Sequence, residues 1–384
     1  MIDRRSSGTQ VRVSWRQRWA IIGLLAVMGG CDSVAPMTAS ATRLTVVGRL
    51  ERGATVQVVV RSGADSVVGS QLTLSVIPAS EATVGSDGML TLLQAGPVTI
   101  QARLPNDSVV SGTFTVAVPP SVLFDLSVSG NRDIYEAAID GGDLTRLTTA
   151  GGDDVHPTVA AGKVVFTSYR NGQADLYTFS LSDTTERRLT TAPDNETDPA
   201  LSPDGQHLAF VRDTGGVGRV WIAAGDATGA VRLTTETAPS PEAAPAWSTD
   251  GRVVFTSTAA GSADLDVVVA ANAPTAASPL VAANTAAAEV EGAWSPDAKQ
   301  IAFVSTRTGP SELYVLDIST GQVTLIPGAG TNVAQPTWLP DGRIVFVDLL
   351  VSGGQLAWID PQAPTVAHTI PLPAGDPQHP AAVR

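Results

Sequence analysis

The sequence of 384 residues contains one cysteine, two lysines and few aromatic side chains, which make up 5% of the residues. With Cys31 as the single cysteine, no intramolecular disulfide can form, and thiol chemistry elsewhere in the chain is excluded. Only 16% of residues are charged, and the formal net charge is −13. Such a surface is repelled by phosphate backbones, so we predict that the protein does not bind nucleic acid.

Amphipathic helical patterns are also missing after residue 30. Short runs of Val, Thr, Leu and Ile alternate with clusters of Gly, Asp, Pro and Ser, and the chain holds 36 Gly and 26 Pro. This alternation is typical of β-strands joined by tight turns. We therefore predict an all-β protein, and its length allows more than one domain.

The first 30 residues differ from the rest. Five arginines, and only Asp3 against them, precede an uncharged apolar run at 19–30, WAIIGLLAVMGG. Twelve residues are too few to span a bilayer, which needs about 20. A basic flank before a short apolar run predicts a signal peptide at residues 1–30. The small, polar segment that follows, residues 31–41, is predicted to be a tether.

The stretch LLAVMGGC, residues 24–31, resembles the lipobox of bacterial lipoproteins, although Met28 stands where Leu is usual. The resemblance implies that Cys31 is lipidated, becomes the mature N-terminus and anchors the chain without spanning the membrane. The alternative is an ordinary signal cut near 38–41 and an incidental cysteine. Removing residues 1–30, with five arginines and one aspartate, changes the formal net charge from −13 to −17.

Residues 42–118 alternate between short apolar runs and turn residues. Six or seven strands in this length predict a small β-sandwich. The stretch VGSDGMLTLLQAGPVTIQARL, residues 84–104, resembles the bacterial Ig-like family BIG2. That resemblance implies a spacer or adhesive module. Pro119 and Pro120 then predict a stiff boundary with the next domain.

Residues 121–384 repeat one pattern six times. Six of the eight phenylalanines occupy an equivalent position with spacings of 42, 44, 45, 48 and 43: Phe124, Phe166, Phe210, Phe255, Phe303 and Phe346. Repeats of about 40–50 residues have the length of a four-stranded propeller blade. The pattern predicts a six-bladed β-propeller over 121–384.

A turn motif recurs within these repeats, as in ALSPDGQHLAF, residues 200–210, and TWLPDGRIVF, residues 337–346. Asp-Gly tolerates positive φ, so the motif predicts a tight turn between two antiparallel strands. The Trp and Phe side chains of these strands are predicted to pack between blades. Ala298 and Thr249 depart from the motif in the fifth and fourth repeats.

These pieces resemble the WD40-like repeat of the TolB β-propeller family over nearly all of 121–384. The resemblance implies that the P-x-W-S strand lines a central channel and that the protein makes protein contacts in the cell envelope. TolB itself carries a different N-terminal domain, so the resemblance does not assign this chain to the Tol–Pal system. In this arrangement residues 380–384 complete the blade that begins at 123–124 and close the ring.

One set of residues could form a site. The residue before the inner strand's Pro or Gly is, in the six repeats, His156, Asp198, Ala244, Glu291, Gln335 and His379. With the ring closed, these residues would face one mouth of the channel. Imidazoles and carboxylates are good ligands for a divalent transition metal, and some propeller lyases of pectic sugars hold a metal with channel histidines. The simpler interpretation is a wet, polar channel mouth.

Standard catalytic signatures such as G-x-S-x-G, H-E-x-x-H and the P-loop are absent from the sequence. The acidic run APDNETDP, residues 192–199, lacks EF-hand spacing, so we expect it to be a solvated loop. We predict an exported, envelope-anchored lipoprotein that acts without a cofactor as a non-catalytic scaffold for envelope proteins. The alternative is a secreted propeller enzyme, a polysaccharide lyase or metal-dependent hydrolase, that uses the channel mouth, a divalent metal and a carbohydrate substrate.

Overall fold

The computed structural model describes residues 42–62, 65–128, 130–235, 241–258, 264–269, 278–279 and 287–383. The predicted signal peptide, the tether and Cys31 lie outside these residues. The regular elements of the described part are strands and short 3-10 turns, which confirms the all-β fold class. Within the same ranges no helix is long and apolar enough to cross a membrane.

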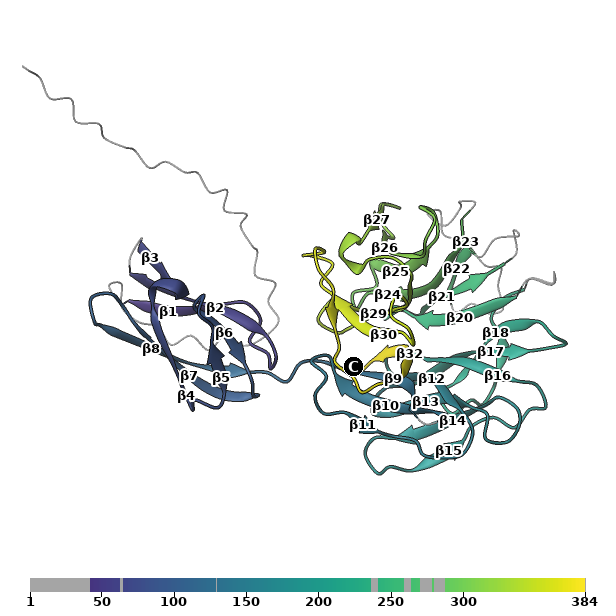
Figure 1. The fold of residues 1–384 in the computed structure, drawn as a ribbon. Helices are drawn as coiled ribbons and strands as arrows, with labels where there is room; N and C mark the ends of the chain where they lie inside the picture. Colours follow the sequence, from purple (N-terminus) through teal and green to yellow (C-terminus); the bar gives the residue numbers. More distant parts are fainter. Residues whose placement is uncertain are drawn as a thin grey trace, which may run out of the picture.

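The N-terminal part is a sandwich of two sheets (Figure 1). One sheet has the order β1-β2-β6-β5, with β3 on β2, and the other has the order β4-β7-β8. Its strands are β1 (Arg43–Val47), β2 (Thr55–Ser62), β3 (Asp65–Val68), β4 (Thr73–Ile77), β5 (Ala82–Val84), β6 (Met89–Leu92), β7 (Gly96–Arg103) and β8 (Val109–Val116). Alternate residues such as Val56, Leu90 and Ile100 point between the sheets and are fully buried.

The sandwich has eight strands, so the prediction of six or seven was wrong. The missed elements, β3 and β5, have four and three residues. Runs this short carry too few alternating positions to be recognised in the sequence. The Ig-like assignment of this sandwich stays a prediction.

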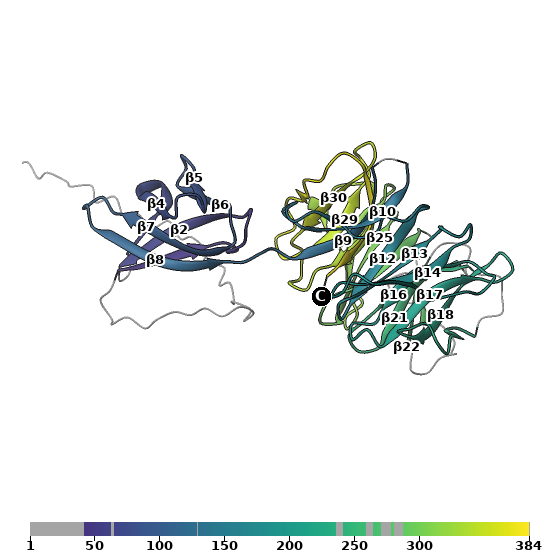
Figure 2. The same cartoon turned by 90° about the horizontal axis from the view of Figure 1, so that it is seen from below.

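The remaining strands form six four-stranded sheets arranged as the blades of a propeller (Figures 1 and 2). Blade 1 holds β32 (Asp376–Ala382), β9 (Ser121–Ser127), β10 (Arg132–Ala138) and β11 (Thr145–Arg146). Blade 2 holds β12 (Asp154–Ala160), β13 (Lys163–Ser168), β14 (Asp175–Ser180) and β15 (Glu186–Arg188). Blade 3 holds β16 (Glu196–Leu201), β17 (His207–Asp213), β18 (Gly218–Ala224) and β19 (Val231–Arg232).

The other three blades follow the same order from the inner strand outward. Blade 4 holds β20 (Glu242–Trp247), β21 (Arg252–Ser257), β22 (Asp264–Val269) and β23 (Ser278–Pro279). Blade 5 holds β24 (Glu289–Trp294), β25 (Gln300–Ser305), β26 (Glu312–Asp317) and β27 (Val323–Leu325). Blade 6 holds β28 (Val333–Trp338), β29 (Ile344–Asp348), β30 (Gln355–Ile359) and β31 (His368–Thr369).

The recurring turn joins the inner strand of a blade to its second strand. In blade 3 the N–H of Gly205 donates to the carbonyl of Ser202 at 2.8 Å, and Gly205 has φ of +69°. In blade 5 Ala298 adopts φ of +57° at the same place, although its Cβ disfavours that conformation. The turn therefore keeps its shape where the glycine is lost.

Aromatic side chains fill the space between blades. The six repeated phenylalanines on the second strands are each at most 1% exposed. Trp338 of blade 6 is 3% exposed, and its indole N–H donates to the carbonyl of Ala293 in blade 5 at 3.1 Å. The predicted role of these residues in packing between blades matches their burial.

The last strand and the first strand of the propeller lie in the same blade. β32 pairs antiparallel with β9, from Asp376 opposite Ser127 to Ala382 opposite Val122. β9 is thereby bonded on both sides, to β32 and to β10. Neither end of the ring presents a free strand edge at this seam.

The two faces of the ring differ. The face on which the inner strands begin is called the mouth face here, and the face with the recurring turns is called the turn face. The sandwich contacts the turn face through ion pairs. Arg52 Nε lies 2.6 Å from Asp140 Oδ2, and an Arg343 guanidinium nitrogen lies 2.9 Å from Glu51 Oε2. The mouth face is left uncovered by these contacts.

We expect Phe124→Ala to lower the free energy of unfolding by about 3–5 kcal/mol, since the ring is fully buried beside β32. Urea denaturation measures the loss. Val366→Ala is the control, because Val366 is 62% exposed and should change stability by less than about 0.5 kcal/mol. Equal effects of the two substitutions would contradict the seam described above.

Candidate functional site

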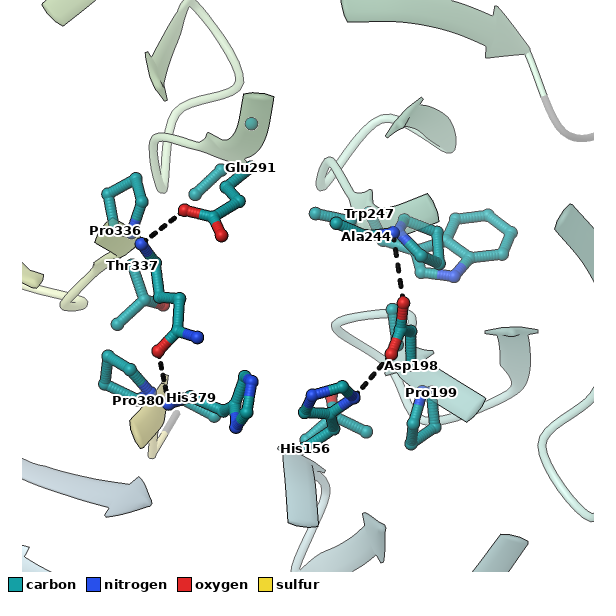
Figure 3. A pocket seen from close by; sticks show the side chains of 18 of the residues that line it. His156, Asp198, Pro199, Ala244, Trp247, Glu291, Pro336, Thr337, His379 and Pro380 are labelled. Carbon is teal, nitrogen blue, oxygen red and sulfur yellow. Dashed lines mark hydrogen bonds and ion pairs between the residues drawn. The ribbon is translucent and has the colours of Figure 1, made fainter. Parts of the chain in front are cut away.

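A cavity of about 510 Å³ runs between the six inner strands. Its wall consists largely of proline, alanine and threonine side chains, with Trp247 and Trp294 among them. All six residues singled out in the sequence line it (Figure 3). The structure thus brings the predicted set together at the channel, on the side where the inner strands begin.

The same backbone step places all six side chains. Each inner strand shifts its register at this point, as a β-bulge does. The residue at the bulge has a left-handed φ in every blade: 52° at His156, 49° at Asp198, 49° at Ala244, 58° at Glu291, 54° at Gln335 and 50° at His379. Because bulges redirect side chains, the six residues line the channel. Figure 3 shows His156, Glu291 and His379 directed into it.

Hydrogen bonds link the six positions around the channel. The N–H of Gln335 donates to Glu291 Oε2 at 2.6 Å, and the N–H of His379 donates to Gln335 Oε1 at 2.7 Å. The N–H of Ala244 donates to Asp198 Oδ2 at 3.4 Å. Asp198, Glu291 and Gln335 therefore each hold the backbone of the next blade. Ala244 has no polar group, and Thr256 Oγ1 accepts the N–H of Glu291 at 3.2 Å instead.

Two histidines meet where the ring closes. The ring centroids of His156 and His379 are 3.6 Å apart, with an angle of 70° between the rings. His156 Nδ1 forms an ion pair with Asp198, and His379 Nδ1 lies 2.7 Å from Asp125 Oδ1. Asp125 is fully buried on β9 and also accepts hydrogen bonds from Arg132 Nε at 2.5 Å and from the N–H of His156 at 3.2 Å. Each imidazole thus has its own carboxylate.

The environments of the two histidines shift their pKa values in opposite directions. Burial lowers the pKa of His379, and the neighbouring His156 adds to this, while Asp125 opposes it. Burial also acts against a charge on His156, but the hydrogen bond and charge of Asp198 raise its pKa. The first proton in this pair therefore sits on His156. Across the channel, burial raises the pKa of Glu291.

The metal hypothesis needs at least three ligands around one point. Among the described residues, no three His, Cys, Asp or Glu side chains are grouped so that they could hold a metal ion. Asp198 and Asp125 are each bound to an imidazole instead. The structure therefore gives the divalent metal of the alternative hypothesis no preformed ligand set within the described ranges.

The sequence analysis missed a second set of charged residues. Asp154, Glu196 and Glu289 stand at the start of their inner strands and are fully buried. Each lies close to an arginine that follows or ends the second strand: Asp154 with Arg170 at 2.9 Å, Glu196 with Arg212 at 3.0 Å and Glu289 with Arg307 at 3.1 Å. Each guanidinium also lies over a ring, as Arg170 does 4.3 Å from the centroid of Tyr177.

This set corrects one expectation. Residues 196–199 of the acidic run belong to inner strand β16, and Glu196 is buried, so the solvated loop expected for 192–199 ends before them. A signal was present, because the acid and its arginine are 16 residues apart in both 154/170 and 196/212. Asp125 carried no comparable signal, since it follows a buried phenylalanine inside an apolar strand.

Comparison with known proteins identifies the repeat. The TolB beta propeller domain family matches residues 119–241 and 227–358. A protein TolB homolog of Chlorobium luteolum is 29% identical over 182 residues, which cover 47% of this chain and 38% of the homolog. The Tol-Pal system protein TolB of Anaeromyxobacter dehalogenans is 33% identical over 85 residues, covering 22% of this chain and 19% of that protein. The matched part of this chain thus spans less than two fifths of these relatives' length.

A solved structure supports the same fold. The crystal structure of TolB from Acinetobacter baumannii superposes with a TM-score of 0.61 at 17% identity, covering 75% of this chain and 80% of that one. At this identity the likeness shows the fold alone.

We predict opposite pH effects for substitutions of the two histidines. The stabilisation from neutral His379 is fully present above its ordinary pKa and is lost as pH falls through its lowered pKa. That from charged His156 is fully present below its ordinary pKa and is lost as pH rises through its raised pKa. His379→Asn should therefore reduce the loss of stability on acidification, and His156→Asn should reduce the loss towards neutral and alkaline pH.

Urea unfolding between about pH 5 and 8 measures both slopes. His368→Asn is the matched control, because His368 is exposed on β31, away from the mouth. Slopes that change in the same direction for the two mouth variants would contradict the assignment of the proton to His156.

Proposed function

Because the chain belongs to the TolB beta propeller domain family, we propose that it is a non-catalytic scaffold that binds envelope proteins through the mouth face of its propeller. The family match carries this proposal, since it covers residues 119–358, more than half of the chain. The relatives that match include a Tol-Pal system protein. A partner in the envelope is therefore the class of ligand that the family favours.

The chemistry of the mouth supports binding over catalysis. Asp198 and Asp125 are engaged by His156 and His379, and Gln335 and Glu291 hold the backbone of neighbouring blades. The carboxylates of Asp198, Asp125 and Glu291 are thus committed to structural contacts. The channel wall is mostly apolar, as is common in sites that bind a segment of another molecule. A lyase or hydrolase is less consistent with this arrangement.

The proposed scaffold is attached to the membrane through its N-terminus. A signal peptide over residues 1–30 and a lipid on Cys31 would place the folded parts outside the cytoplasm, tethered by residues 31–41. The negative net charge keeps anionic headgroups from competing for the propeller surface.

Capture from envelope extracts of the source bacterium tests the binding function. We expect Ala244→Arg to abolish capture of a partner that the wild-type protein retains, because the new side chain would project into the mouth at a bulge that accepts large residues in other blades. Val366→Arg adds the same charge at an exposed position on the turn face and should leave capture unchanged. Retention of the partner by Ala244→Arg, or the absence of any captured protein, would count against the proposal.

Replacing the single cysteine tests the anchor. We expect Cys31→Ala to move the protein from the membrane fraction to the soluble fraction and to remove metabolic labelling with an alkyne fatty acid. Ser33→Ala is the control and should keep both properties. A Cys31→Ala protein that stays with the membrane would favour another mode of attachment.

A further inference from the structure

Exposed apolar side chains gather on one side of the mouth face. Within the described part of the propeller, seven large hydrophobic residues are at least 45% exposed: Val128, Tyr169, Val231, Leu349, Leu350, Val351 and Val366. Five of them lie on or at the start of the loops that join the second and third strands of blades 6, 1 and 2. The same loops of blades 3 and 5, residues 214–217 and 306–311, contribute none to this set.

These five residues, Val128, Tyr169, Leu349, Leu350 and Val351, are called the apolar arc here. The three loops lie on consecutive blades, and blade 6 lies beside blade 1 because β32 and β9 share a blade. Loops between second and third strands stand on the mouth face, beside the starts of the inner strands. The arc is therefore placed next to the half of the mouth that holds the two histidines.

Backbone contacts connect the three loops. The N–H of Leu349 donates to the carbonyl of Asn332 at 2.9 Å, and Gly353 lies against Gly375, just before β32. On the other side of β32, Ser127 pairs with Asp376, next to Val128. These contacts connect the loop of blade 6 with the loop of blade 1.

The link from blade 1 to blade 2 runs through one aspartate. The N–H of Arg132 donates to Asp153 Oδ1 at 2.8 Å, and the N–H of Tyr169 donates to the carbonyl of Asp153 at 2.9 Å. Burial and the charges of Asp198 and Asp153 raise the pKa of Tyr169, as expected for a phenol close to the mouth. The three loops of the arc are thus linked by hydrogen bonds and strand pairing from blade 6 to blade 2.

Carboxylates lie between the apolar tips. Asp153 lies between blades 1 and 2, and Asp348 stands at the base of the loop of blade 6, whereas Asp376 at the seam between blades 6 and 1 is already paired with Arg132 at 2.8 Å. A contiguous apolar patch with polar groups around it is the usual mark of an interaction site. The acidic groups favour a ligand that is positively charged at its edges.

We propose that the apolar arc is a docking surface for a polypeptide segment of another protein, in which two or three apolar side chains are flanked by lysine or arginine. This inference rests on the proposed scaffold function and assigns the face and the chemistry of the partner. The apolar side chains of the segment cover Leu349, Leu350 and Val351, and its basic groups approach Asp348 and Asp153. The corresponding loops of blades 3 and 5 add no residue to the arc, so the segment lies across blades 6, 1 and 2.

Selection from a displayed library of random peptides against the whole protein tests this directly. We expect enriched peptides that combine apolar residues with lysine or arginine. Synthetic copies should bind about tenfold or more weakly to Leu350→Ser, and binding to the wild-type protein should weaken with added salt. Val366→Ser is the matched control, because Leu350 and Val366 are both 62% exposed and lie on opposite faces.

Leu350→Ser changes only an exposed side chain, so loss of folding does not confuse the result, and urea unfolding verifies this. Peptides that bind Leu350→Ser as tightly as the wild-type protein would overturn the docking surface, as would enrichment of acidic peptides. Binding to vesicles of phosphatidylglycerol and phosphatidylethanolamine that is lost in Leu350→Ser would overturn it in favour of a lipid surface. Loss of the captured envelope partner in Ala244→Arg but not in Leu350→Ser would keep the scaffold function and reject the arc.

Discussion

The antiparallel pairing of β32 with β9 is the contact on which the arrangement of the mouth depends. It brings His379, from the end of the chain, within ring contact of His156, more than 200 residues earlier. It also brings Asp125 of β9 beneath both histidines. Without this pairing, blade 6 would not lie beside blade 1, and neither the histidine pair nor the apolar arc would be assembled. The pairing that closes the ring therefore also assembles the histidine side of the mouth.

Buried ion pairs fix the start of the inner strand against the rest of the blade in blades 2, 3 and 5. An unpaired buried carboxylate is strongly destabilising, whereas a paired one is tolerated. Each acid at the start of an inner strand in blades 2, 3 and 5 therefore meets an arginine that is itself stacked on an aromatic ring of the same blade. Geometry around the channel is then maintained by side-chain hydrogen bonds from one blade to the next. These contacts engage the carboxylates of Asp125, Asp198 and Glu291 in holding neighbouring blades together.

Much of the propeller was predictable because its information is local and repeated. The spaced phenylalanines and the Asp-Gly turns recur in sequence, and repetition separates them from chance. The six channel residues were found by the same route, since each precedes a proline or glycine at an equivalent place. Asp125 could not be found in this way, because it lies within an apolar strand and its partner His379 is brought to it only by closure of the ring. Glu196 was misassigned because a polar run resembles a loop unless its arginine, 16 residues later, is taken into account.

The sandwich is attached to one face of the propeller, the turn face. Arg343 is 2% exposed and is held between Glu51, Asp341 and the ring of Trp358, so the sandwich is joined to blade 6 by a largely buried cation. Arg52 makes a second contact, with Asp140 and Asp143 of blade 1. Both contacts lie on the turn face. The sandwich therefore lies on the side of the ring opposite the mouth, and the channel and the apolar arc open away from it. Blades 6 and 1 thus carry the contacts with the sandwich on one face and most of the apolar arc on the other.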